Sequence, residues 1–267
     1  MNKIEKYVWS ENYLINQGYN KVDIDKYFNI KLEIIKKIKN EIFTECTINK
    51  KREKKLILLF GQPGCGKSTY MNKNAIDDYV ILDIDTYREF HPYKNEIINI
   101  INKNHEENKL PEKNSPGRDF TNFTRRFIGI LFDEIFEECI KQGYNIALQK
   151  HASNYKDLEK LLKKLQNNDY ETSFILPLIS SKISWERCKK RNIINDMVLN
   201  TVPKEFHDNY VSKIPQTVID IIENYILKEG YISKIEIINN KQIIIINKNT
   251  DFDANFIKKY ISDNLES

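Results

Sequence analysis

The sequence has little of several residue types that mark particular protein classes. Its 267 residues include only 8 glycines and 7 prolines, which argues against a fibrous or low-complexity chain. Its four cysteines have no CxxC or Cys/His spacing, so neither a zinc site nor a disulfide framework is indicated; they are Cys46, Cys65, Cys139 and Cys188. No apolar run approaches the roughly 18 residues of a membrane span, and the first residues lack the apolar core of a secretory signal. We therefore expect a cytoplasmic protein with no membrane partner.

The composition indicates a globular chain of mixed charge. Hydrophobic residues make up 40% and charged residues 30% of the sequence, and the formal net charge is +4. Lysine is abundant, but it is interleaved with Asp and Glu. A nucleic-acid partner is therefore unlikely but not excluded.

Apolar strand-like runs alternate with amphipathic helical segments along most of the chain. Strands are expected in residues 55–60, 78–85, 143–149 and 171–179, with helices beginning near 67, 94, 120, 154 and 184. Residues 2–48 are expected to be mostly helical, 105–119 to be a polar loop, 233–249 to be a hairpin and 254–265 to be a closing helix. The alternation predicts an α/β fold of the P-loop kinase-like type, a doubly wound parallel sheet flanked by helices, with a C-terminal β-hairpin.

No Pro/Gly-rich linker divides the chain, so a single domain over residues 1–267 is expected. Within it we distinguish an N-terminal helical segment (1–55) packed on the core, a nucleotide- and acceptor-binding core (56–228), and the hairpin with its terminal helix (229–267).

One stretch, GQPGCGKST, has the spacing of a phosphate-binding loop, the Walker A pattern, between a strand and a helix. Backbone N–H groups of such a loop surround phosphate oxygens, and the following helix adds its positive end. Lys67 is expected to reach the β- and γ-phosphates of ATP or another nucleoside triphosphate, and Ser68 to bind Mg²⁺. The predicted nucleotide-binding residues are Gly61, Gln62, Pro63, Gly64, Cys65, Gly66, Lys67, Ser68 and Thr69.

Among proteins with such loops, small-molecule kinases require the fewest further elements. A base-recognition segment of the NKxD type and an obvious Walker B pattern are both missing from the sequence. A kinase needs an acid to accept the proton of the acceptor hydroxyl, and mobile arginines to neutralise the transferred phosphoryl group. Asp85, at the end of the second strand, is the predicted base, although it could also cap the next helix. Arg187 and Arg191, four residues apart on one helix, are the predicted lid arginines, although a solvated basic helix gives the same pattern.

GQPGCGKST followed by VILDIDTYREFHPYKNEI resembles the zeta toxin family of bacterial toxin–antitoxin kinases. The family segments D-x-D-x-[FY]-[RK]-x-x-HP and T-P-x-x-x-H correspond to the stretches beginning at Asp83 and at Val202. The resemblance covers roughly residues 34–247. It implies ATP-dependent phosphorylation of a nucleotide sugar such as UDP-N-acetylglucosamine, growth inhibition, and an antitoxin protein as a possible partner. It also implies that Asp85 acts as the base and that Arg191 stabilises the transition state.

The acceptor side departs from the family pattern. Where the family has Glu-Gly-Thr after the third strand, this chain has Gln149, Lys150 and His151, and a second lid arginine is replaced near Asn200. The residues expected to contact the acceptor are Asp83, Arg88, His91, Asp133, Gln149, Lys150 and His151. Two alternatives therefore stay open: a kinase for another acceptor (a dinucleotide, a nucleoside or an RNA end), and a nucleotide-gated binding protein with impaired turnover.

Overall fold

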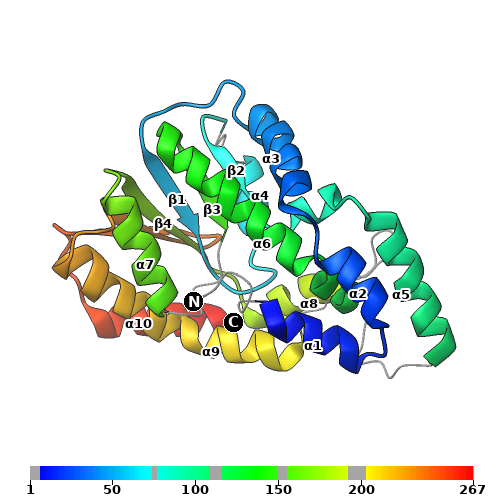
Figure 1. The fold of residues 1–267 in the computed structure, drawn as a ribbon. Helices are drawn as coiled ribbons and strands as arrows, with labels where there is room; N and C mark the ends of the chain where they lie inside the picture. The colour runs from blue at the N-terminus through cyan, green and yellow to red at the C-terminus, as the bar shows by residue number, and fades with distance from the viewer. Residues whose placement is uncertain (1–6, 74–76, 109–115, 150–154, 192–202, 267) are drawn as a thin grey trace. The chain divides into compact units, whose positions relative to one another are not determined.

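The computed structural model of the chain describes residues 7–73, 77–108, 116–149, 155–191 and 203–266 (Figure 1). Contacts divide the chain into two compact units. One unit contains Met1–Cys46, Asp83–Glu137 and Lys189–Thr201, and the other contains Thr47–Leu82, Glu138–Cys188 and Val202–Ser267. We call them the helical unit and the sheet unit. The single-domain organisation expected from the sequence stays a prediction.

The sheet unit is built on six strands in the order β2-β3-β1-β4-β5-β6. The strands are β1 (Lys55–Leu59), β2 (Val80–Leu82), β3 (Ile146–Gln149), β4 (Glu171–Pro177), β5 (Lys234–Ile238) and β6 (Ile243–Asn247). All pairings are parallel except that of β5 with β6, which form the antiparallel hairpin. The predicted α/β fold with a C-terminal hairpin is confirmed.

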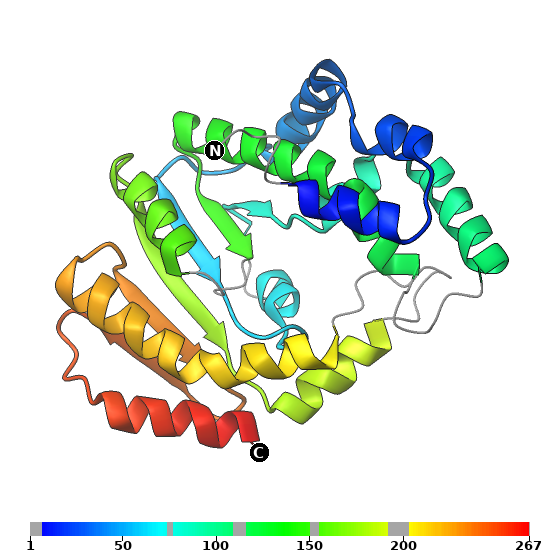
Figure 2. The same cartoon turned by 60° about the horizontal axis from the view of Figure 1, so that its bottom comes forward.

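Alternation along β1 directs side chains to the two faces of the sheet. Leu59 packs with Met71, Ala147 and Ile175, so the helix α4 (Lys67–Lys73) covers this face. Phe60, the next residue, lies against α9 (Lys204–Ile221) on the opposite face. The other helices of this unit are α7 (Tyr155–Gln166), most of α8 (Ser181–Arg191), η3 (Ile222–Lys228) and α10 (Ala254–Glu266), with the end of α6 (Pro116–Gln142). Figure 2 shows α9 and α10 side by side along the hairpin.

The helical unit has its own apolar core. Its elements are α1 (Val8–Asn16), α2 (Lys21–Phe28), α3 (Leu32–Cys46), η2 (Thr86–Phe90), α5 (Lys94–Asn108) and most of α6. Leu14, Ile24, Ile97, Phe120 and Phe123 are fully buried in one cluster. A buried carboxylate fastens these helices together, because Asp119 accepts hydrogen bonds from the hydroxyls of Tyr13 (2.8 Å) and Tyr19 (2.5 Å).

Several expected boundaries differ from the structure. The polar loop expected over residues 105–119 is shorter, because α5 continues to Asn108 and α6 begins at Pro116. The second strand ends at Leu82, so Asp83 and Asp85 lie beyond it and not on it. Asp83 Oδ1 accepts the backbone N–H of Asp85 at 3.1 Å, which turns the chain into the short helix η2. No element was predicted for residues 204–221, which form α9 although Pro215, ordinarily a helix breaker, lies inside it.

Candidate functional site

Residues 60–66 form a loop between β1 and α4, and α4 begins with Lys67 and Ser68, as the predicted phosphate-binding loop requires. Gly64 and Gly66 have φ angles of 78° and 100°, a region that side chains disfavour. The backbone N–H groups of Gly64, Gly66, Lys67 and Ser68 donate to no other described backbone group. Several amide donors are therefore available around one concave turn, which fits an anion such as a triphosphate.

Lys67 lies folded over this loop. Its side chain is buried, and Nζ donates to the carbonyl oxygens of Gly61 (3.0 Å) and Gln62 (3.1 Å). These are neutral acceptors, so no carboxylate neutralises the ammonium in these contacts. The charge therefore lies where it would attract the phosphates of a nucleotide.

Ser68, the predicted metal ligand, faces Gln149 at the end of β3. The Ser68 Oγ lies 3.2 Å from Nε2 and 3.4 Å from Oε1 of Gln149. A neutral amide thus stands beside the hydroxyl where the family pattern has a carboxylate. No group of three or more His, Cys, Asp or Glu side chains placed to hold a metal ion occurs among the described residues. A Mg²⁺ ion held here would take Ser68 from the protein and its other oxygens from phosphate and water.

The helix α8 lies directly on the loop. A Cβ atom at Gly64 would overlap the carbonyl oxygen of Ser184 and lie 3.0 Å from Cys188 Sγ. A Cβ at Gly66 would lie 3.5 Å from Nη1 of Arg187. The guanidinium of the exposed Arg187 therefore lies at the end of the loop, beside Gly66. Arg191 is the last residue of α8.

The predicted base lies in the helical unit, on the turn that follows β2. The Asp85 carboxylate is half-exposed, and its Oδ1 accepts Nε (3.3 Å) and Nη2 (3.1 Å) of Arg88. Arg88 itself is buried, and its Nη1 donates to Thr124 Oγ1 (2.6 Å) and to the carbonyl of Thr121 (3.2 Å) on α6. Burial lowers the pKa of Arg88, while Asp85 opposes that shift. Arg88 therefore connects Asp85 to a long helix.

The other residues predicted for the acceptor have different surroundings. His91 is buried, with Nδ1 accepting the N–H of Tyr93 (3.2 Å) and Nε2 lying 3.2 Å from the carbonyl of Tyr27, and burial lowers its pKa to about 4. Asp133 is partly buried on α6, and Asp83 holds the turn described above. Lys150, His151 and Asn200 lie outside the described residues.

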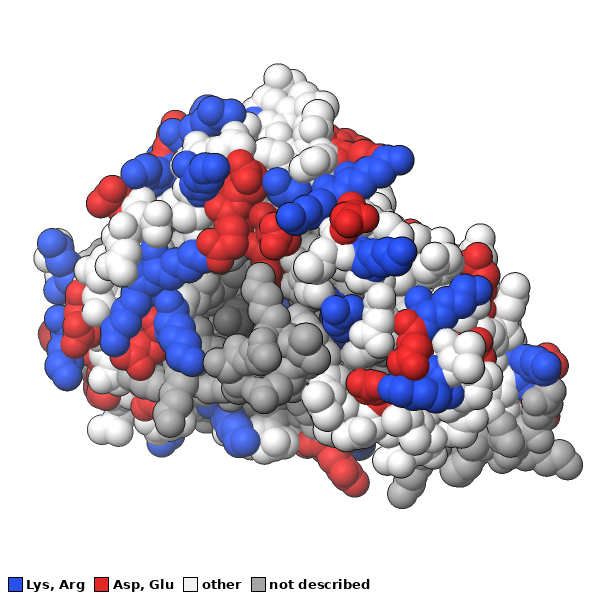
Figure 3. Space-filling model, in the orientation of Figure 1, with Lys and Arg blue, Asp and Glu red and all other residues white. Residues whose placement is uncertain are grey.

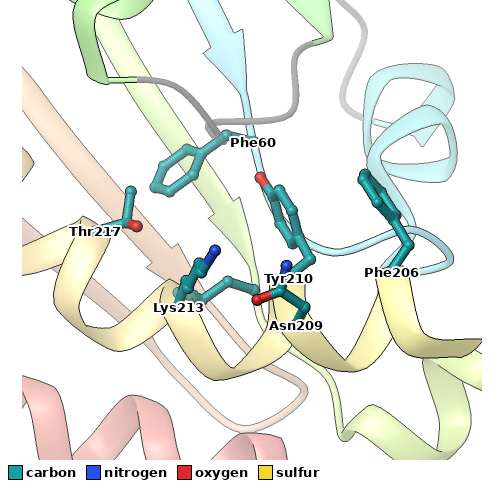
Figure 4. Close-up of a pocket in the computed structure, with 7 residues that line it drawn as sticks. Phe60, Phe206, Asn209, Tyr210, Lys213 and Thr217 are labelled. Carbon is teal, nitrogen blue, oxygen red and sulfur yellow. The ribbon is translucent and has the colours of Figure 1, made fainter.

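Sequence reasoning did not identify a pocket on the opposite face of β1. A cavity of about 70 Å³ lies between Phe60 and α9, with Phe206, Asn209, Tyr210, Lys213, Ile214 and Thr217 as its other lining residues (Figure 4). The rings of Phe206 and Tyr210 stack with centroids 6.5 Å apart. Because Phe60 directly precedes Gly61, this pocket adjoins the start of the loop.

Two broader features bear on partners. Lys and Arg lie among Asp and Glu over the face drawn in Figure 3, with no continuous patch of one sign among the described residues there. None of the described helices is long and apolar enough to cross a membrane.

The parallel sheet, the Gly-rich loop and the arginine helix on it define a P-loop kinase-like α/β protein. The family model described as Zeta toxin matches residues 39–251, and the chain belongs to the zeta toxin family. It is 25% identical over 193 residues to a Toxin zeta of Streptococcus agalactiae and to one of Streptococcus pyogenes. These matches cover 70% of this chain, which spans 60% of the length of those relatives.

Solved structures share the fold. A structure from the PezAT chromosomal toxin–antitoxin system of Streptococcus pneumoniae has a TM-score of 0.72 at 20% identity, with 90% of both chains covered. A structure of AvrRxo1-ORF1:-ORF2 with ATP has a TM-score of 0.60 at 10% identity, covering 94% of this chain and 76% of that one.

Proposed function

We propose that this protein is an ATP-dependent phosphotransferase of the zeta-toxin type, which transfers the γ-phosphoryl group to a hydroxyl of a nucleotide sugar resembling UDP-N-acetylglucosamine. The observation that carries the proposal is the position of Arg187. A guanidinium beside Gly66, at the end of a loop rich in free amide donors, suits the charge of a transferring phosphoryl group.

Each residue has a defined task in this reaction. Lys67 exchanges the carbonyls of Gly61 and Gln62 for phosphate oxygens, and Ser68 contributes a ligand to Mg²⁺, which supplies charge neutralisation at the phosphates. The acceptor oxygen attacks the γ-phosphorus, its proton passes to Asp85, and ADP leaves with the bridging oxygen. Arg187 and Arg191 stabilise the charge on the transferred group, and Arg88 orients Asp85.

The neutral Gln149 beside Ser68 favours one alternative within the same class. An amide at this position has no negative charge and one acceptor oxygen instead of two, so it binds substrate hydroxyls differently from a carboxylate. A different phosphoryl acceptor, such as a dinucleotide, a nucleoside or an RNA end, is therefore the second candidate.

Product analysis with a panel of acceptors tests both candidates. The purified protein is incubated with ATP, Mg²⁺ and UDP-N-acetylglucosamine, other nucleotide sugars, dinucleotides, nucleosides or a short RNA. We expect phosphorylated nucleotide sugar from the wild type and a loss of about 10²- to 10⁴-fold in kcat for Asp85→Asn. ATP binding without acceptor-dependent ADP would leave the third possibility, a nucleotide-gated binding protein. Unchanged turnover in Asp85→Asn would exclude Asp85 as the base.

We also propose that the protein inhibits growth and is restrained by an antitoxin protein, because structures sharing its fold come from toxin–antitoxin systems. Expression of the wild type is expected to slow growth in bacteria, and expression of Lys67→Ala is not. Equal growth of both strains at equal protein levels would contradict this.

A further inference from the structure

Three buried polar side chains from three different elements form a chain of hydrogen bonds that begins in the loop. Gln62 Nε2 lies 3.5 Å from the Oγ of Ser184 on α8, and the same Oγ lies 2.9 Å from Nε2 of His207 on α9. All three residues have 0% of their surface exposed. Gln62 Nε2 also donates to the carbonyl of Ile179, just before α8, at 2.8 Å.

The Ser184 hydroxyl has one partner on its own helix besides the two on other elements. Its Oγ donates to the carbonyl oxygen of Ser181 at 2.9 Å. The hydroxyl has a single proton, so its hydrogen bond with His207 Nε2 runs in the direction that the tautomer of His207 sets. In either direction Ser184 Oγ accepts from the amide of Gln62, and the far nitrogen of His207, Nδ1, lies 3.3 Å from Oδ1 of Asp208.

The chain connects to Arg187 through the backbone of α8. Ser184 and Arg187 are one helical turn apart, so a shift of Ser184 moves Arg187 with it. Gly64 lies beneath the same turn and admits no side chain there, so the loop and α8 are in direct backbone contact. Gln62 and His207 hold Ser184 from two sides. Their contacts therefore bear on the position of the α8 turn that carries Arg187.

We propose that His207 is a positioning residue for phosphoryl transfer, which acts through Ser184 to keep Arg187 over the phosphate-binding loop. The inference rests on the proposed function and adds a residue to its machinery. A solely structural role, in which His207 satisfies a buried hydroxyl and stabilises α9, gives the same contacts but different kinetics.

A double-mutant cycle between His207 and Arg187 separates these roles. His207→Leu removes the hydrogen bond between Ser184 and α9, whereas His207→Gln keeps an amide that can accept or donate near the position of Nε2. We expect His207→Leu to lower kcat about tenfold and His207→Gln to stay within about twofold of the wild type. In the Arg187→Met background, adding His207→Leu should lower kcat by less than about twofold, because the guanidinium that His207 positions is already absent. Ser184→Ala should behave like His207→Leu, and Glu205→Gln, exposed on the same turn of α9, is the matched control.

The same cycle can be measured without turnover. Isothermal titration calorimetry with ATP and with ADP gives the ratio of the two affinities, which reports the contacts to the γ-phosphate. We expect His207→Leu to lower this ratio in the wild-type background and to leave it unchanged in Arg187→Met. If the wild type binds ATP but makes no product, the proposed function fails while this ratio still tests the inference.

Thermal unfolding with the same variants addresses loss of the fold. A His207→Leu protein that loses only melting temperature, with kcat and the affinity ratio of the wild type, would overturn the proposal. So would equal losses from His207→Leu with and without Arg187. If His207→Leu does not fold, Ser184→Ala carries the test, because it removes the hydroxyl that links Gln62 to His207 without changing His207 itself; wild-type kcat and affinity ratio in a folded Ser184→Ala protein would then overturn the proposal.

Discussion

Ser68 and Gln149 contact each other at the carboxyl ends of the neighbouring strands β1 and β3, with the Ser68 hydroxyl 3.2 Å from Nε2 of Gln149. Ser68 is the second residue of α4, the helix after β1, and Gln149 is the last residue of β3, which pairs with β1 in parallel. The contact joins the residue predicted to hold Mg²⁺ to a position where the family pattern has an acid. The electrostatic difference between the chain and its family is therefore adjacent to the proposed metal.

Replacing Gln149 with Glu should strengthen binding of Mg²⁺ with ATP. A carboxylate at this position accepts the hydroxyl of Ser68 and adds a negative charge within reach of the cation, directly or through water. We expect the Mg²⁺ concentration that half-saturates ATP binding to fall by about 10-fold, within the 10- to 100-fold range typical of residues that orient metal ligands. Titration of Mg²⁺ at fixed ATP measures it, and Gln149→Met, which is neutral, serves as the control. An equal response in both variants would show that charge at this position does not act on the metal.

Lys67→Ala should abolish most nucleotide affinity while leaving the fold intact. Charge-assisted hydrogen bonds contribute about 1.5–3 kcal/mol each, so losing one to the phosphates is expected to weaken ATP binding about 10- to 100-fold. The contacts that Lys67 makes here are to loop carbonyls, which water can replace. Calorimetry with ATP measures the effect. Lys55→Ala, at the opposite end of β1, is the control and should bind ATP normally. Wild-type affinity in Lys67→Ala would remove the loop from the nucleotide site.

Arg88 is expected to affect both turnover and stability. Arg88→Met leaves Thr124 Oγ1 and Asp85 without their shared donor, which should cost about 1–3 kcal/mol of unfolding free energy and lower kcat. Arg88→Lys keeps the charge but not the fork of donors, so its kcat should fall between those of wild type and Arg88→Met. Denaturant unfolding and steady-state kinetics measure the two effects separately. Wild-type kcat in a folded Arg88→Met protein would contradict the role of Arg88 in orienting Asp85.

His91 should make the protein less stable in acid. Burial lowers its pKa from 6.5 to about 4, so the unfolded chain takes up a proton in this interval that the folded chain does not. The unfolding free energy should therefore fall as pH drops from about 6.5 to about 4, by at most about 3 kcal/mol. His91→Gln cannot titrate and should show a shallower slope in urea unfolding across this interval. Parallel slopes for the two proteins would assign the acid sensitivity to other groups.

The parts of the molecule that follow local patterns were predictable. The loop could be located because β1 is a short apolar run and because Gly61, Gly66 and Lys67 have a characteristic spacing. Family membership followed from motifs near that loop, and the family model confirms it. The hairpin and the closing helix also lie where their patterns predict them.

Features that depend on tertiary contacts were not predictable. The sequence predicts that Asp85 ends a strand. In the structure the strand ends at Leu82, because the Asp83 carboxylate accepts the N–H of Asp85 and turns the chain there. The helix α9 forms although it contains Pro215, because burial of its apolar side, including Tyr210 and Ile214, stabilises it. No sequence spacing predicts the link between Gln62 and His207, since it runs through Ser184 and requires β4, α8 and α9 to fold together.

The central place of β1 has a consequence for synthesis of the protein. Leu56 lies opposite Ile146 on one side and Thr172 on the other, so a growing chain contains the Gly-rich loop long before it contains either neighbour of the strand that holds it. We expect a nascent chain to gain nucleotide affinity only after residues through α8 have left the ribosome. Arrested chains ending after β3 and after α9, tested for retention on immobilised ATP, measure this; retention of the shorter chain would contradict it. A chain interrupted before α8 would then contain the whole Gly-rich loop and still not bind nucleotide.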